Sequence, residues 1–233
     1  MREGLTESPL NPLPLAVWLL ALPIIACEAV FALGQAGIIG GAQGVGMRLS
    51  AMQMTAFAPE MVQRMWQLGV VDWDQLYRFV SFSFVNMSLT QALFVVVFTL
   101  ALGNLVAQQF RPIALILLFF GSAIGGALVY TVAMSLLPGR AQPLIGGYPA
   151  VYGLVGAFTF LLWARLAAAN ANRMRAFTLI GMLLLFQFVF GVVFGGAGYG
   201  WIAEIAGFAV GFGLSFLLID GGVTRALRHI RQR

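Results

Sequence analysis

Long apolar segments alternate along this chain with short polar connections. Each apolar segment is long enough to cross a hydrocarbon core of about 30 Å as a helix that rises about 1.5 Å per residue. The predicted spans are 14–34, 85–107, 112–136, 149–168, 176–196 and 200–219. The sequence has no dyad repeat of apolar and polar residues typical of a membrane β-barrel. It therefore predicts an all-α, polytopic membrane protein with six transmembrane helices.

The composition excludes a soluble globular domain. Of the 233 residues, 61% are hydrophobic and 9% are charged, and the mean hydropathy is +0.92. A soluble domain carries about 25% charged residues, so this chain cannot cover a surface that faces water. The single cysteine, Cys27, rules out an internal disulfide and a cysteine-rich metal site, and the single histidine, His229, lies near the C-terminus. We expect neither a metal nor a cofactor.

One connection is long, and it divides the first span from the second. This loop, about 41–77, mixes apolar and charged residues and contains Trp66 and Trp73, a residue type that favours the level of the lipid headgroups. An amphipathic segment that lies in the membrane interface is expected there. The predicted organisation is an N-terminal segment 1–13, a membrane domain 14–220 and a basic tail 221–233.

All the basic residues are arginines, and their positions indicate an orientation. If both termini face the cytoplasm, nine arginines lie on the cytoplasmic side and four on the other. This asymmetry favours cytoplasmic termini, and it explains the basic charge without nucleic acid, which we do not expect as a partner. Inner-leaflet lipid suffices as the partner of the arginine tail.

Small residues recur at four-residue intervals in several spans. Residues at this spacing lie on one face of a helix, where they let two helix backbones approach closely. We expect spans four and six to cross through such a face. The packing positions are Gly121, Gly125, Gly153, Gly156, Gly207 and Gly211.

Several segments resemble those of a known family. The segment 146–158, Gly-Gly-Tyr-Pro-Ala-Val-Tyr-Gly-Leu-Val-Gly-Ala-Phe, resembles the segment beginning Gly-x-Ser-Gly that opens the fourth helix of rhomboid intramembrane proteases. The segment 201–211, Trp-Ile-Ala-Glu-Ile-Ala-Gly-Phe-Ala-Val-Gly, resembles their last helix, which carries Ala-His-x-x-Gly-x-x-x-Gly. Segment 76–88 resembles the family's approach to its second helix, and segment 91–103 resembles that helix. The resemblance covers roughly residues 15–220 and implies a six-helix rhomboid bundle with a long first loop.

The departures from the family pattern fall on the reactive positions. The family hydrolyses peptide bonds with a serine and a histidine, and the resemblance puts Tyr148 at the serine position and Glu204 at the histidine position. Pro149 replaces the glycine that follows the serine. Gln91 and Val95 stand where the family usually has the His and Asn that help to hold the oxyanion. None of the family's catalytic roles can therefore be transferred to this chain.

Tyr148 and Glu204 are a poor substitute for a serine and an imidazole. A phenol, with a pKa of about 10, is a good leaving group, so an ester formed on it from an amide collapses back. Pro149 fits the first turn of a helix, which gives the Tyr148-Pro149 pair a structural explanation. Because the two reactive positions of the family face each other, we expect a hydrogen bond between Tyr148 and Glu204.

Glu28 is a second acidic residue at membrane depth, where an ionised side chain is costly. The spans contain no lysine or histidine, so we expect Glu28, Glu204 or both to be protonated because of burial. Three roles remain open for Glu28: a neutral carboxyl bonded to a neighbouring helix, a polar contact for a client helix, or a step in a proton pathway.

The sequence thus predicts a rhomboid-like pseudoprotease of a bacterial inner membrane. It would bind a transmembrane segment of a client or partner protein and act as an adaptor, chaperone or complex subunit. Two alternatives remain: an active intramembrane serine protease with a non-standard site, and a small transporter or channel that uses Glu28 and Glu204.

Overall fold

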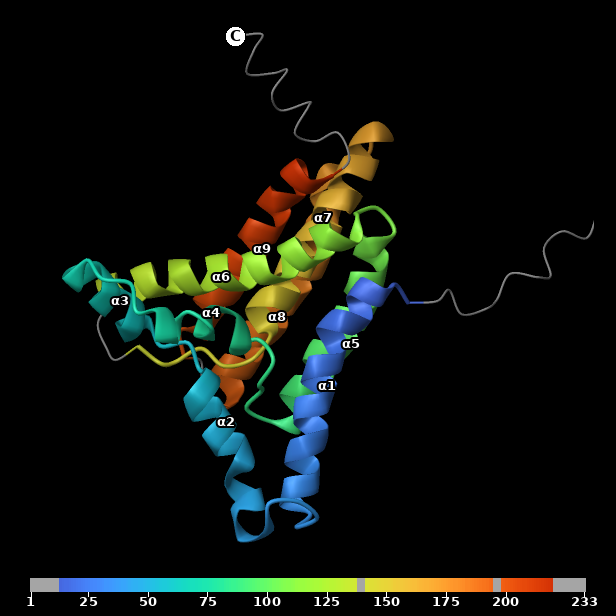
Figure 1. The fold of residues 1–233 in the computed structure, drawn as a ribbon. Coiled ribbons are helices and arrows are strands. Elements are labelled where there is room, and N and C mark those ends of the chain that lie inside the picture. Colours follow the sequence, from blue (N-terminus) through green and yellow to red (C-terminus); the bar gives the residue numbers. More distant parts are fainter. Residues whose placement is uncertain (1–12, 138–140, 195–197, 220–233) are drawn as a thin grey trace, which may run out of the picture.

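The structure, a computed structural model, describes residues 13–137, 141–194 and 198–219 (Figure 1). Every named element in these ranges is a helix, and the extended backbone forms one isolated antiparallel bridge between Phe57 and Leu144. Residues 1–12, the predicted tail 221–233 and His229 within that tail lie outside the described residues. The elements are α1 (Leu15–Gln35), η1 (Gly41–Gly46), α2 (Met47–Thr55), α3 (Pro59–Leu68), η2 (Trp73–Gln75), α4 (Arg78–Ser81), α5 (Leu89–Ala107), α6 (Pro112–Leu136), α7 (Tyr148–Ala168), η3 (Arg173–Phe177), α8 (Thr178–Phe194) and α9 (Gly200–Leu218).

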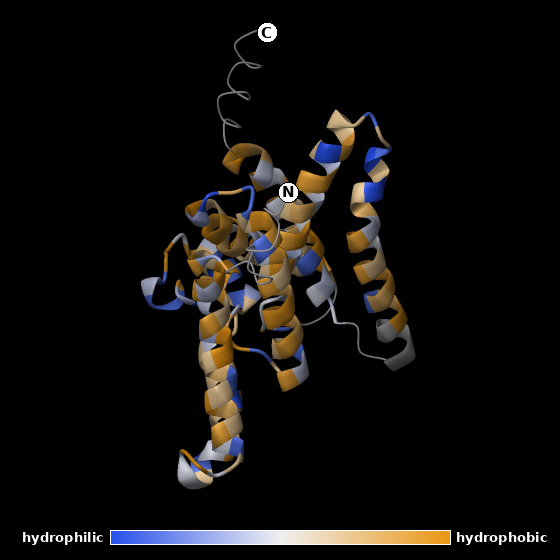
Figure 2. Cartoon of the chain, turned by 90° about the vertical axis from the view of Figure 1, so that its right-hand side faces the viewer, coloured by the Kyte–Doolittle hydropathy of each residue, from blue (hydrophilic) through white to orange (hydrophobic). Residues whose placement is uncertain are grey.

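Five helices in the described part of the chain are long and apolar enough to cross a membrane: α1, α5, α6, α7 and α9. Apolar residues cover most of their surface, and polar residues gather at the connections (Figure 2). Their bounds lie within one residue of the predicted spans except at α5, which begins at Leu89 rather than near residue 85. The hydroxyl of Ser88 caps this helix by accepting a hydrogen bond from the Gln91 N–H at 3.2 Å, so the preceding residues are free to form a turn.

The predicted span 176–196 is described only in part, because its last two residues lie outside the described residues. Residues Arg173–Phe177 form the 3₁₀ helix η3, and α8 contributes 17 described residues. At about 1.5 Å per residue, that length is about 25 Å, which falls short of a core of about 30 Å. The described part of α8 is therefore not among the five candidate spans.

The long connection between α1 and α5 is mostly helical. A glycine-rich turn reverses the chain after α1 and leads into α2, so that α1 and α2 converge at this turn (Figure 1). The backbones of Gly34 and Gly44 meet there, since a Cβ on Gly34 would lie 2.7 Å from the carbonyl oxygen of Gly44. The predicted amphipathic segment is α3, in which Val62 is buried while Glu60 and Arg64 are exposed.

Helix α7 lies at the centre of the bundle and has the largest buried share of the five candidate spans. It contacts α5, α6 and α9, and its contact with α9 is made by backbone against backbone. A Cβ added to any of three glycines would collide with the facing helix. The facing pairs are Gly211 with Gly153, Gly207 with Pro149, and Gly156 with Phe208.

Two further glycines of the predicted packing set lie where α6 contacts α9. A Cβ on Gly121 would lie 2.9 Å from Cδ1 of Leu214, and a Cβ on Gly125 would lie 2.8 Å from Cγ2 of Val210. Here the obstacle is a side chain, which can move, rather than a backbone carbonyl. The contact of α9 with α7 is therefore the more rigid of the two.

This difference between glycines predicts the effect of two matched substitutions in α9. Gly211→Ala should lower the unfolding free energy by about 1–3 kcal/mol, because the new methyl group overpacks the backbone of Gly153. Gly213→Ala is the control, since nothing lies within 4 Å of its Cβ position, and it should be neutral or stabilising by up to about 1 kcal/mol through helix propensity. Thermal unfolding of both variants in detergent checks this, and equal melting temperatures would contradict the rigid contact.

Candidate functional site

The loop that leads into α7 is fastened to the segment in front of α5. Gly146 has a φ of 106°, a conformation that side chains rarely adopt, and its N–H donates to the Phe82 carbonyl at 2.9 Å. Two residues before Gly146, Leu144 exchanges two backbone hydrogen bonds of 2.8 and 3.0 Å with Phe57. The first turn of α7, with Tyr148 as its first residue, is therefore held in place by the long first connection.

Gln91, at one of the predicted oxyanion positions, is bonded to the backbone on both sides. Its Oε1 accepts from the Met87 N–H at 3.0 Å, and its Nε2 donates to the Ile145 carbonyl at 3.4 Å. Nε2 also occupies the space that a Cβ on Gly146 would need. The amide thus joins the start of α5 to the loop before α7.

Val95, at the other oxyanion position, is fully buried behind the same loop. A Cβ on Gly147 would lie 2.6 Å from Cγ1 of Val95 and 2.9 Å from the Ser83 carbonyl oxygen. The Gly147 N–H donates to Oδ1 of Asn86 at 3.3 Å. Asn86 is a site residue that the sequence reasoning missed. Its only signal was an amide among apolar residues just before the second span.

Tyr148 packs against an apolar cluster rather than reaching a base. Its half-buried side chain lies on Ile24, Ala92, Val95 and Val151, which come from α1, α5 and α7. Within the described residues its phenol makes no hydrogen bond.

The predicted hydrogen bond between Tyr148 and Glu204 is wrong. Oε2 of Glu204 accepts instead from Nε2 of Gln187 in α8 at 2.5 Å. The hydroxyl of Tyr152, one turn after Tyr148, donates to Oε1 of Gln187 at 3.5 Å. The carboxylate is thus engaged by α8, which the sequence analysis predicted as a span but not as the partner of Glu204. The result is a polar network across α7, α8 and α9. Gln187 could have been noticed as the lone amide in an apolar span.

Glu28 is ion-paired with an arginine of the first connection, a partner that the sequence analysis did not predict. Arg48 of α2 donates from Nη1 to Oε1 and from Nη2 to Oε2, both at 2.8 Å. The Arg48 side chain is 14% exposed and the Glu28 side chain is 9% exposed. Two parallel bonds of this kind are the geometry that guanidinium and carboxylate groups favour. The glycine-rich turn after α1 brings Arg48 back beside Glu28, although the two residues are 20 positions apart.

The same guanidinium holds the segment before α5. Nη1 of Arg48 also donates to the Asn86 carbonyl at 3.0 Å, and the Arg48 Cζ lies 4.9 Å from the ring centre of Phe31. Since Asn86 in turn accepts from Gly147, a continuous set of polar contacts runs from Glu28 in α1 to the beginning of α7.

Comparison with known families gives one match. The family model described as the Rhomboid domain matches residues 73–221, which is well over half of the chain. The matched region includes Tyr148 and Glu204, but it begins after α1 and α2 and so leaves out Glu28 and Arg48. No match to a curated protein was found.

The ion pair predicts a specific pattern of stability changes. Arg48→Met should lower the unfolding free energy by about 3–5 kcal/mol, because it leaves the Glu28 carboxylate buried without its partner. The double variant Glu28→Met/Arg48→Met should recover much of this loss, since no unpaired charge remains. Arg64→Met, a change at an exposed arginine of α3, is the control and should stay within about 0.5 kcal/mol of the wild type.

Thermal unfolding in a mild detergent measures all four proteins. A double variant as unstable as the Arg48→Met single variant would contradict the view that an uncompensated charge is the cause.

Proposed function

The chain belongs to the rhomboid family, and from this premise we propose that it is a pseudoprotease. It binds a transmembrane segment of a client or partner protein and acts as an adaptor, chaperone or subunit of a membrane complex. One observation carries the proposal: the residue at each reactive position makes a structural contact. These residues are Tyr148, Glu204, Gln91 and Val95.

The positions of the nucleophile and the base lack the required chemistry. Tyr148 contacts an apolar cluster, and Glu204 is bonded to Gln187. The chain contains no lysine, and its only histidine is His229, so neither a serine–histidine nor a serine–lysine pair can form within the spans. Of the serines, Ser83 and Ser122 are fully buried in packed regions. These facts support the absence of a protease mechanism.

The oxyanion positions support the same conclusion. An oxyanion hole needs hydrogen-bond donors directed at an empty space about 3 Å away, where the negative oxygen forms. The Gln91 amide is bonded to the Ile145 carbonyl, and Val95 offers no donor. The Gly147 N–H, which could point at such an oxygen, donates to Asn86 instead. The contacts at positions 91, 95 and 147 therefore support a structural role rather than that of an oxyanion hole.

The binding role rests on α8. Among the described side chains of this helix, Gln187 is the one that hydrogen-bonds to α7 and α9. Large apolar side chains on α8 are exposed, and the helix stands to one side of the other spanning helices, at the right of Figure 2. A client helix lying beside α8 would cover these side chains and would meet the network of Tyr152, Gln187 and Glu204 at one edge.

We also propose that α8 completes a sixth span and that both termini face the cytoplasm of a bacterial cell. Six spans put the two termini on one side. The connections between α5 and α6 and between α7 and α8 then lie on that side, and they carry Arg111, Arg173 and Arg175. An excess of arginine in cytoplasmic connections supports this orientation.

The two rival functions have less support. A protease with another nucleophile would lack a histidine or lysine base within the spans. A transporter that uses Glu28 and Glu204 would need a polar path between them, whereas Glu28 is held by Arg48 and Glu204 by Gln187. No hydrogen bond in the described part of the chain links the two pairs.

The purified protein in bilayers should not cleave a panel of rhomboid substrates, because it lacks the nucleophile, the base and the oxyanion donors. A fluorophosphonate probe should label no serine, and an active rhomboid protease in the same vesicles is the positive control. Substrate cleavage that persists in Tyr148→Phe, or labelling of a serine located by mass spectrometry, would contradict the proposal.

Gln187→Leu should weaken the binding of partner helices. It removes the donor to Glu204 and leaves that carboxyl without its partner, at a cost of about 1–3 kcal/mol. Native purification followed by mass spectrometry should recover several-fold less of the main partner than the wild type does. Met182→Leu, at an exposed position of the same helix, is the control. If the Gln187→Leu variant recovers as much partner as the wild type, the network does not contribute to client binding.

A further inference from the structure

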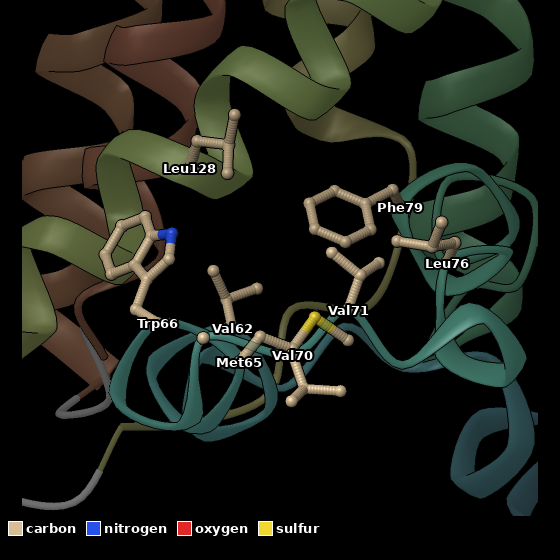
Figure 3. A pocket seen from close by; sticks show the side chains of 9 residues that line it. Val62, Met65, Trp66, Val70, Val71, Leu76, Phe79 and Leu128 are labelled. Carbon is tan, nitrogen blue, oxygen red and sulfur yellow. The ribbon is translucent and has the colours of Figure 1, made fainter.

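A groove lies between α3 and the C-terminal half of α6, outside the site described above. Its volume is about 390 Å³, and it opens to the surface on one side. Trp66 and Phe79 stand at opposite sides of it, Val62 and Val71 lie below, and Leu128 of α6 lies above (Figure 3). The groove is thus formed where the long first connection meets a spanning helix.

The lining is almost wholly apolar. Among the nine lining residues, the indole nitrogen of Trp66 is the one side-chain nitrogen or oxygen. A polar ligand would lose its hydrogen bonds to water here without replacing them, which costs several kcal/mol per group in apolar surroundings, about 2–7. The chemistry of the lining therefore selects a hydrocarbon ligand.

The groove borders a candidate membrane-spanning helix. Helix α6 has 25 residues and is one of the five helices that are long and apolar enough to cross a membrane. Leu128 lies eight residues before the end of α6 at Leu136, and Gln63 of α3 donates to the carbonyl of Thr131 at 3.4 Å. Helix α3 is therefore held beside the C-terminal half of a candidate membrane-spanning helix.

The groove is also continuous with the surface that faces lipid. Val129 and Val132, which follow Leu128 on α6, are exposed, as are Val70 and Val71 at the rim of the groove. In a protein that spans a membrane, exposed apolar side chains on a spanning helix are in contact with acyl chains. The same lipid that covers α6 can extend a chain into the groove.

We propose that this groove binds one acyl chain of a membrane phospholipid, which lies between α3 and α6. The bound chain fills the space between α3 and α6, so it connects the long first connection with the bilayer. This site is independent of the pseudoprotease proposal, because the groove shares none of its lining residues with the site around Tyr148 and Glu204.

The test uses the full chain in lipid nanodiscs that contain a trace of phosphatidylcholine with a photoreactive diazirine near the end of one acyl chain. After irradiation, mass spectrometry should find labels at Phe79 and Leu128, at a level several-fold above labels on the exposed face of α5. Val71→Trp, at a half-exposed rim position, should fill the groove and reduce the labels at Phe79 and Leu128 several-fold. Val97→Trp on α5, at a similarly exposed position, is the control and should leave them unchanged.

Two outcomes would overturn the proposal. One is labelling of Phe79 and Leu128 that matches the α5 surface and does not respond to Val71→Trp. The other is protection of both residues from the lipid by a co-purified protein cross-linked at the groove. If Val71→Trp lowers the melting temperature, Val70→Trp blocks the same rim from a more exposed position and gives the same readout.

Discussion

The contact between the backbones of α7 and α9 determines where the other parts of this protein lie. Gly211 and Gly207 bring α9 against the carbonyl groups of Gly153 and Pro149, at distances that exclude any side chain. Carbonyl groups within a helix cannot move aside without breaking the helix, so this contact has little freedom. It fixes the first turn of α7 beside the turn of α9 that carries Glu204. The arrangement of the polar groups around that point follows from it.

The beginning of α7 is held from the opposite side by polar contacts. Arg48 joins Glu28 to the backbone of Asn86, and Asn86 accepts from Gly147 at the start of α7. In a rhomboid protease of the pattern that this sequence resembles, the region around this loop would hold a nucleophile and its oxyanion donors. Here the Gln91 amide donates to the Ile145 carbonyl and accepts from the Met87 N–H, so it joins two segments of backbone. In this structure the residues at those positions pack against or bond to the surrounding helices.

Polar side chains at membrane depth are costly unless they are paired, and both acidic residues of the spans have a partner. Glu28 pairs with an arginine from the first connection, and Glu204 pairs with an amide from α8. Each pair joins two elements that are distant in the sequence, so each stabilises an arrangement of helices. The long first connection contributes at two places, through Arg48 and through the apolar groove under α3.

The sequence by itself determined the membrane class, the helical form and, except for the start of α5, the bounds of five spans, because hydrophobic length and the hydrogen-bonding demands of lipid act locally along the chain. It also identified the family. It did not determine the partners of Glu28 and Glu204, and the expected bond between Tyr148 and Glu204 does not form. Those partners, Arg48 and Gln187, lie 20 and 17 residues away on other helices, where only the path of the chain in three dimensions brings them into reach. A pairing between side chains depends on distances of a few ångströms, which periodicity and composition do not specify.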